Sequence, residues 1–349
     1  MLEIHCSGTP REIGFQHGKH AKESIHGSIT FYTWKFQDSA KLTWPQVQNL
    51  AFDFEPIMRR KWPDYLEEMT GIAAGAELDV ADIIALNVRT EIAFGLFSDG
   101  CTALSWRTGS GSWLAQNWDW DERQKANLVN LTIEQAGKPT IRMITEAGLI
   151  GKIGLNSAGV GACLNAIKAK GMDPTRLPCH LGLRMVLESR SREEAVQRLE
   201  KYGIASACHM LIADPTGGVG LEWSSVEMRK VVMNAEQQVF HSNHYLLEHA
   251  GVEDKNWLAD SKFRVGRIEE LAKKVPGEPT YDKLFEVFKD TANSPGSICR
   301  TQDNKKSSSA TLFNIIMDLE KRRANVALGK PDSPDEQFVL SFERTNGHL

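Results

Sequence analysis

The chain has 349 residues, of which 41% are hydrophobic and 25% are charged, and its formal net charge is −4. This composition is that of a globular protein long enough to bury a large core, and the mild negative charge argues against a nucleic-acid-binding protein with a basic surface. The sequence lacks both the run of about 18 apolar residues that a membrane span needs and the blocks of a signal peptide. We therefore expect an intracellular protein, cytoplasmic by default.

The six cysteines are scattered along the chain and form no Cys-x-x-Cys pair. This spacing indicates neither a zinc site nor a disulfide framework. We expect no metal and no bound cofactor.

The first part of the chain carries the patterns of amphipathic helices. The segment Thr9-Pro10-Arg11-Glu12 can begin a helix, because Thr9 can cap it, Pro10 suits its first position and Glu12 completes a capping box. Apolar residues recur at helical spacing near 45–58, 63–73 and 79–94. Residues 1–98 are therefore predicted to be predominantly helical.

After Cys101 the apolar pattern changes to a period of two, which is typical of strands. Turn sequences between paired segments predict three hairpins, and helical and further strand patterns follow. Helices, strands, helices and strands in this order indicate one layered α+β domain over residues 1–349. The hairpins are predicted at 101–106 with 112–118, 128–133 with 140–145, and 149–155 with 160–166. Helical patterns follow at 181–188, from a capping box at 191–194 through 199, and at 259–290; strands are predicted at 207–213, 218–223, 230–232, 311–317, 324–328 and 338–342.

The dipeptide Gly100-Cys101 lies where the helical pattern gives way to the strand pattern. A thiol at this position could attack the carbonyl carbon of Gly100 and leave Cys101 as a new N-terminus. Glycine suits the upstream position because it tolerates the twisted backbone that such an attack needs. By itself the dipeptide is common, and a buried structural cysteine is the simpler interpretation.

Polar residues at the ends of apolar strand patterns are further candidates for a site. Asp119 closes the second strand of the first hairpin, which should bring it back beside Cys101. Asn165, Asn243 and Arg300 end or interrupt later apolar segments. Turn formation and a solvated surface charge are the alternative interpretations for these residues.

The motifs around these candidates resemble the fungal acyl-coenzyme A:isopenicillin N acyltransferases, in order and spacing and nearly from end to end. The resemblance implies an N-terminal nucleophile hydrolase, a four-layer αββα sandwich whose precursor cleaves itself into residues 1–100 and 101–349. The similar segments are 8–18, Asp99-Gly100-Cys101-Thr102, Gln116-Asn117-Trp118-Asp119, 145–148, 156–160, Ser297-Ile298-Cys299-Arg300, 310–316 and 331–342.

The resemblance also implies roles for four residues. Cys101 would be the autoproteolytic residue and then the nucleophile, with its freed α-amino group as the base; such a group has an ordinary pKa near ~8, which leaves a useful neutral fraction. Asp119 and Arg300 would hold and polarise this end of the site, and Arg300 would favour the thiolate. Asn243 would donate to the oxyanion of the tetrahedral intermediate.

Two supporting residues and two departures complete the comparison. Asn165 would be a second asparagine of the site, and Ser224 a serine of supporting function. Gln116 stands where bile-salt hydrolase and ceramidase relatives often carry arginine, as it does in the acyltransferases. The C-terminal Gly347-His348-Leu349 is a degenerate form of a peroxisomal address, so a peroxisomal location is the alternative to the cytoplasm.

The function that this resemblance implies is acyl exchange. The enzyme would replace the aminoadipyl side chain of isopenicillin N with an acyl group from acyl-coenzyme A, through an acyl-Cys101 thioester. Acyl-coenzyme A would be a co-substrate, and the two fragments of the precursor would form a heterodimer. We expect no nucleic acid and no membrane as partners.

Two other functions stay open at this stage. The chain could be an N-acylamide hydrolase or peptidase-like paralogue of the same fold, which passes its acyl group to water. It could also be a paralogue that no longer processes itself and acts as an inactive or binding protein.

Overall fold

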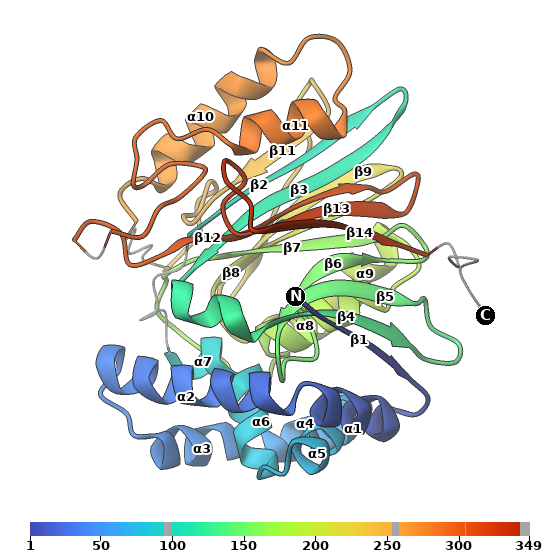
Figure 1. The fold of residues 1–349 in the computed structure, drawn as a ribbon, viewed down its shortest axis with the longest axis vertical. Helices are drawn as coiled ribbons and strands as arrows, with labels where there is room; N and C mark the ends of the chain where they lie inside the picture. The colour runs from blue at the N-terminus through green and yellow to red at the C-terminus, as the bar shows by residue number, and fades with distance from the viewer. Residues whose placement is uncertain (94–99, 253–257, 304, 343–349) are drawn as a thin grey trace.

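A computed structural model describes residues 1–93, 100–252, 258–303 and 305–342. Within these residues the chain forms an eight-stranded and a six-stranded sheet, stacked face to face, with helices on both outer sides (Figure 1). This is a four-layer αββα arrangement, so the predicted α+β fold class is confirmed.

The elements alternate along the chain much as the sequence patterns predicted. In chain order they are β1 (Leu2–Ser7), α1 (Pro10–His20), α2 (Lys22–Ser39), α3 (Trp44–Phe52), α4 (Glu55–Lys61), α5 (Pro63–Ala76), α6 (Val80–Asn87), α7 (Arg89–Ala93), β2 (Gly100–Thr108), β3 (Gly111–Trp120), the 3-10 helix η1 (Glu122–Asn127), β4 (Leu128–Glu134), β5 (Ile141–Glu146), β6 (Ile153–Asn156), β7 (Gly161–Ala166), α8 (Cys179–Leu187), α9 (Arg192–Tyr202), β8 (Cys208–Asp214), β9 (Gly217–Trp223), β10 (Met228–Val231), β11 (Gln238–His241), α10 (Ser261–Lys273), α11 (Tyr281–Phe288), β12 (Ala310–Asp318), β13 (Arg323–Leu328) and β14 (Glu336–Ser341).

The two sheets have simple strand orders. The larger sheet runs β1-β4-β5-β6-β7-β8-β9-β10, and the smaller one runs β11-β2-β3-β12-β13-β14. Among the described strands, β1 and β4 run parallel and the other neighbouring pairs are antiparallel. Central strands such as β8 and β12 are buried along their whole length, because each sheet is covered on both faces.

Helices α10 and α11 cover the outer face of the smaller sheet, and the other helices lie on the far side of the larger sheet (Figure 1). Residues of α10 and α11 share an apolar cluster with Leu104 and Ala115 of the smaller sheet. On the other side, Gly182 of α8 approaches Met210 of β8. None of the described helices is long and apolar enough to cross a membrane.

Several elements differ from the sequence predictions; among them, helix α2 and strand β11 lie where no separate helix or strand was predicted. The N-terminal strand β1 was not predicted, because only Ile4 and Cys6 of its residues are buried and the pattern is short. The predicted helix at 259–290 is two helices, since Pro276 and Gly277, the latter with a φ of +65°, lie between them. Strand β6 begins only at Ile153, after the turn around Gly148.

Helices α1 and α5 pack unusually closely through facing glycines. A Cβ atom on Gly14 would lie 1.9 Å from the carbonyl oxygen of Glu68, and one on Gly71 would lie 2.3 Å from the carbonyl oxygen of Arg11. Both obstacles are backbone atoms, so a side chain could be accommodated only if the helices moved apart.

We therefore expect Gly71→Ala to lower the free energy of unfolding by about 1–3 kcal/mol, the usual range for overpacking. Urea unfolding monitored by circular dichroism measures this change. Gly266→Ala is the matched control: it lies in α10, where a Cβ meets no atom within 4 Å, so replacing a helical glycine should leave stability unchanged or raise it by about 1 kcal/mol. Equal effects of the two variants would contradict the packing argument.

Candidate active site

The hairpin of β2 and β3 sets the position of the candidate nucleophile. Its register places Gly100 opposite Asp119 and Cys101 opposite Trp118. Because successive side chains of a strand point to opposite faces, Cys101 and Trp118 point toward the larger sheet, whereas Asp119 points toward the side of α10 and α11. Asp119 therefore lies beside Gly100, on the opposite face from the thiol.

Side chains hold both main-chain groups of Cys101. Its N–H donates to Oδ1 of Asn243 at 2.9 Å, and its carbonyl oxygen accepts from Nη1 of Arg264 at 2.6 Å and from Oγ of Ser242 at 3.0 Å. Strand β11 pairs with β2 up to His241 opposite Ala103. Ser242 and Asn243 come next in the chain, and their side chains, in place of a strand backbone, form the hydrogen bonds to Cys101.

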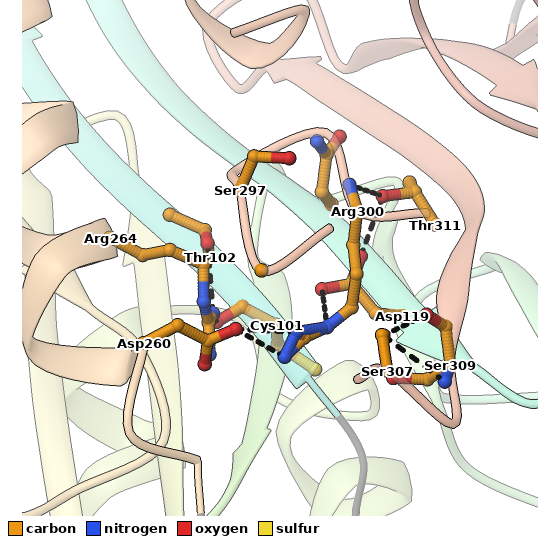
Figure 2. A network of polar contacts seen from close by, with 12 residues as sticks. Cys101, Thr102, Asp119, Asp260, Arg264, Ser297, Arg300, Ser307, Ser309 and Thr311 are labelled. Carbon is orange, nitrogen blue, oxygen red and sulfur yellow. Dashed lines mark hydrogen bonds and ion pairs between the residues drawn. The ribbon is translucent and has the colours of Figure 1, made fainter. Parts of the chain in front are cut away.

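Arg264 and Asp260 extend this network at the start of α10. The guanidinium of Arg264 also donates to Oδ1 of Asn243 at 2.8 Å and lies 3.4 Å from Oδ1 of Asp260. The other oxygen of Asp260 accepts from Nη1 of Arg300 at 2.6 Å. Figure 2 shows Asp260 between the two arginines, next to Cys101. The carboxylate of Asp260 therefore joins two guanidinium groups that are almost completely buried.

Thr311 joins Arg300 to Asp119. Its hydroxyl donates to Oδ1 of Asp119 at 2.7 Å and accepts from the backbone N–H of Arg300 at 2.9 Å. The pairing of β12 with β3 shifts by one residue between Thr311 and Phe313. Such a bulge re-aims the neighbouring side chains, and here Thr311 meets the carboxylate of Asp119. The Nε atom of Arg300 lies 3.9 Å from Oδ2 of Asp119.

Close approach of two side chains explains the glycine before the nucleophile. A Cβ atom on Gly100 would lie 2.7 Å from Oδ2 of Asp119 and 2.9 Å from Nε of Arg300. A larger residue would separate this ion pair or displace the strand. The sequence suggested glycine for its backbone freedom, whereas the structure supplies a steric reason.

Burial governs the charges of this cluster. The fully buried carboxyl of Asp119 has its pKa raised to about 6, because desolvation outweighs the opposing effects of Arg300, Arg264 and the hydrogen bond from Thr311. Burial likewise lowers the pKa of Arg264, against the attraction of Asp260. Asp119 can therefore gain or lose a proton near neutral pH, beside the peptide bond between residues 100 and 101.

Asn165 precedes Ala166, a residue that is hydrogen-bonded to the network around Cys101. Its neighbour Ala166 uses its carbonyl oxygen to accept from Nδ2 of Asn243 at 3.0 Å. Oδ1 of Asn165 lies 3.0 Å from Nδ1 of His209, and its buried Nδ2 has no hydrogen-bond partner among the described residues.

Ser224 lies in the turn between β9 and β10. Its hydroxyl donates to the carbonyl oxygen of Glu227 at 3.1 Å and accepts from the N–H groups of Glu227 and Val226. Within the described part of the chain, the hydrogen bonds of this side chain stay in the turn. The structure therefore brings together Gly100, Cys101, Asp119, Asn243 and Arg300 and places Asn165 next to them, whereas the hydrogen bonds of Ser224 to described residues lie in its own turn.

Sequence analysis missed Arg264, Asp260, Thr311 and Ser242. Asp260 and Arg264 are spaced i and i+4 at the start of a helix, a pattern that normally marks an ion pair on a solvated helix face. Thr311 and Ser242 were inside segments noted for other residues. The sequence signal that could have pointed to Asp260 and Arg264 is a pair of opposite charges at the start of a predicted helix. This pattern does not show whether the two side chains are buried.

A pocket lies on the side of the smaller sheet to which Trp118, the cross-strand neighbour of Cys101, points. Its lining includes Trp118, Trp120, Leu164, Ala166 and Ile167. We call it the Trp118 pocket. In the described residues no three His, Cys, Asp or Glu side chains are grouped so that they could hold a metal ion; the expectation of no metal or cofactor stays a prediction.

Comparison with known proteins gives consistent matches. A family model described as acyl-coenzyme A:6-aminopenicillanic acid acyl-transferase matches residues 106–333. The chain is 43% identical over 346 residues to the acyl-coenzyme A:6-aminopenicillanic-acid-acyltransferase 40 kDa form of Emericella nidulans, covering 98% of this chain and 96% of that protein.

Two solved structures are also similar, at low identity. The penicillin V acylase from Agrobacterium tumefaciens matches with a TM-score of 0.46 and 14% identity, over 69% of this chain and 86% of that one. A mutant of the conjugated bile acid hydrolase from Clostridium perfringens matches with a TM-score of 0.48 and 14% identity, over 71% and 95% of the two chains.

The raised pKa of Asp119 predicts a pH-dependent effect of its removal. The folded chain holds the Asp119 proton up to about pH 6, whereas the ordinary pKa is 3.8. Protonated Asp119 therefore stabilises the fold fully below pH 3.8, and this contribution is lost as the pH rises through about 6. Asp119→Asn cannot ionise, so its unfolding free energy relative to the parent chain should rise between about pH 4 and pH 7.5.

Urea unfolding at both pH values, with Cys101→Ala in each chain so that the thiol plays no part, measures this difference. Asp303→Asn is the control, because backbone hydrogen bonds lower the pKa of that exposed carboxyl and its removal should give no such rise. A stability difference for Asp119→Asn that stays constant or falls toward high pH would disprove the assignment.

Proposed function

We propose, because this chain belongs to the acyl-coenzyme A:6-aminopenicillanic acid acyltransferase family, that it exchanges the aminoadipyl side chain of isopenicillin N for an acyl group from acyl-coenzyme A. The acyl group passes through a thioester on Cys101. The enzyme first cleaves its own chain between Gly100 and Cys101.

One observation carries this proposal: the main chain of Cys101 is tethered at both its nitrogen and its oxygen, while its side chain points to the Trp118 pocket face. The side chains of Ser242, Asn243 and Arg264 satisfy these buried main-chain groups where the pairing with β11 has ended, and they also hold the residue in place. A fixed position suits a nucleophile, because a small displacement of the attacking atom costs much of the rate.

In the proposed self-cleavage the thiol of Cys101 reacts with the carbonyl of the preceding residue, Gly100. The sulfur of Cys101 attacks that carbonyl carbon, the bond to the Cys101 nitrogen breaks, and the nitrogen takes up the proton. Water then hydrolyses the thioester, which leaves a carboxylate on Gly100 and a free amino group on Cys101. Asp119 would carry a proton in these steps, a role supported by its closeness to Gly100 and by its pKa, which is raised to about 6.

The freed α-amino group then serves as the base of the mature site. Its nitrogen is the atom that donates to Oδ1 of Asn243 in the uncleaved chain, so the same contact would orient the amine toward the thiol. The thiolate attacks the amide of isopenicillin N and releases 6-aminopenicillanic acid, whose nitrogen takes the proton. Water releases the aminoadipyl group from the sulfur.

The second half of the exchange uses acyl-coenzyme A. Cys101 takes the acyl group as coenzyme A leaves as its thiol, and the amine of 6-aminopenicillanic acid then displaces the cysteine. Both intermediates develop a negative oxygen, which needs N–H donors. The amide nitrogen of Asn243 carries a second N–H besides the one that it donates to Ala166, and Nδ2 of Asn165 has no hydrogen-bond partner among the described residues.

The two fragments would stay associated as a heterodimer after cleavage. Strand β1 of the first fragment pairs with β4 of the second, and one apolar core includes residues of both. Acyl-coenzyme A and a β-lactam amide are the small-molecule partners of the proposal. A cytoplasmic location remains the expectation, and Gly347-His348-Leu349, on which the peroxisomal alternative depends, lies outside the described residues.

Self-cleavage predicts two fragments in denaturing mass spectrometry, with masses that place the break between Gly100 and Cys101. Cys101→Ala removes the sulfur that attacks and should keep the chain whole. Cys163→Ala, at a buried cysteine with a raised pKa on β7, should cleave as the unaltered protein does. An intact wild-type chain would rule out the proposed processing.

Acyl transfer predicts a new penicillin when the processed enzyme is incubated with phenylacetyl-coenzyme A and 6-aminopenicillanic acid. Liquid chromatography with mass detection follows both the penicillin and free phenylacetate. We expect the penicillin, because a held amine can compete with water for the acyl-cysteine. Phenylacetate without penicillin would show that the hydrolase alternative is the correct one.

A further inference from the structure

We infer that the Trp118 pocket receives the acyl side chain of the amide substrate and that Glu91 recognises an ammonium group on that chain. The ligand class is a slender apolar acyl chain that ends in an α-amino acid group. This inference rests on the function proposed above and names the part of the protein that would select its first substrate.

The pocket is connected to the nucleophile through two residues that line it. Trp118 is the cross-strand neighbour of Cys101 and shares its face of the sheet, where directly opposite Cβ atoms lie about 5 Å apart. Ala166 accepts a hydrogen bond from Asn243, which in turn holds the nitrogen of Cys101. An acyl group attached to the sulfur would therefore extend along the wall of Trp118, Leu164 and Ile167.

Glu91 is a fully buried carboxyl in the lining of this pocket. Its Oε1 accepts from the backbone N–H of Cys179 and from Oγ of Ser206, both at 2.8 Å. Its Oε2 is buried and has no hydrogen-bond partner among the described residues. Leaving a buried carboxylate oxygen unpaired is costly, so a donor from a ligand would be bound with a gain in free energy.

An ammonium group suits this oxygen better than a neutral donor does. Burial raises the pKa of the Glu91 carboxyl, which reduces its charge in the empty pocket. A cation placed beside Oε2 reverses this effect by favouring the ionised form. The two hydrogen bonds to Oε1 already hold the Glu91 carboxyl in one orientation. Binding of a ligand to Oε2 therefore costs little side-chain entropy.

An α-amino acid group also carries a carboxylate, and two lysines in the lining of the pocket could pair with it. The ammonium of Lys152 lies 4.2 Å from the ring centroid of Trp118 and 3.0 Å from Oε2 of Glu146. Lys168 contributes a second amine to the lining and is only partly buried. A carboxylate at the end of the acyl chain would meet these cations, while its neighbouring ammonium meets Glu91. The aminoadipyl chain has this order of groups: methylenes, then an ammonium and a carboxylate on one carbon.

The test compares three penicillins that differ only in the acyl chain: 5-amino-5-carboxypentanoyl, 5-carboxypentanoyl, which lacks the ammonium, and phenylacetyl. The rate of 6-aminopenicillanic acid release by the processed enzyme gives kcat/KM for each. We expect the wild-type enzyme to prefer the first over the second by about tenfold, the size of one charged hydrogen bond. Glu91→Gln should abolish this preference and leave phenylacetyl cleavage within about twofold.

Ser206→Ala is the matched control. It removes one of the two hydrogen bonds to Oε1 of the same carboxyl and leaves Oε2 and the hydrogen bond from the Cys179 N–H in place, so the preference for the ammonium should persist. Equal wild-type rates for the first two penicillins would overturn the inference, as would a Glu91→Gln enzyme that keeps the preference. An equal loss on all three penicillins would also overturn it, because it would show a structural role.

A binding measurement separates this inference from the proposed function. Calorimetry of the purified protein with 2-aminohexanedioate and with hexanedioate needs no turnover. Tighter binding of the amino compound, lost in Glu91→Gln, would support the ammonium site even if no penicillin is cleaved, in which case only the proposed function fails. Equal binding of both compounds by the wild-type protein would refute the ammonium site whatever the variant does.

Discussion

The candidate site depends on one carboxylate that is shared by two buried arginines. Asp260 lies 2.6 Å from Nη1 of Arg300 and 3.4 Å from Nη2 of Arg264. Two buried guanidinium groups would repel each other and lose their hydration, and a carboxylate between them offsets both costs. Arg264 holds the main chain of Cys101, and Arg300 stands beside Gly100 and Asp119. The groups on both sides of the bond between residues 100 and 101 are thus positioned by one acidic residue just before α10.

The alternation of side chains along β2 and β3 divides the chemistry between two faces of one sheet. The thiol of Cys101 and the ring of Trp118 point toward the larger sheet and the Trp118 pocket, whereas Asp119 points to the ionic cluster under α10. The backbone between Gly100 and Cys101 passes from one environment to the other. Such a division requires that both faces of the sheet be covered, which is what the four layers provide. The fold of this chain therefore allows a nucleophile, Cys101, to lie on one face of the smaller sheet and an acidic residue, Asp119, on the other.

Much of this architecture was predictable from local patterns. The hairpin of β2 and β3 follows from its turn sequence and alternating residues, and the candidates Cys101, Asp119 and Arg300 stood out as polar groups at the ends of apolar segments. Strand β1 was missed because it is short and mostly exposed, and the split between α10 and α11 because apolar residues recur at helical spacing on both sides of Pro276 and Gly277. Arg264 and Asp260 were missed because an i, i+4 ion pair has the same sequence whether it lies in solvent or in a buried site.

The sequence by itself determined the change from a helical to a strand pattern, the α+β class and the place of a cysteine after glycine at that change. Each of these depends on residues that are neighbours along the chain. Only the tertiary structure decided which face the thiol takes, why Gly100 has room for no side chain, and that Oε2 of Glu91 is buried without a described partner. These properties arise where distant segments meet, such as 100–119 with 260–311 or Glu91 with Ser206. The burial and pairing of a polar group depend on what packs against it, and that information is not local.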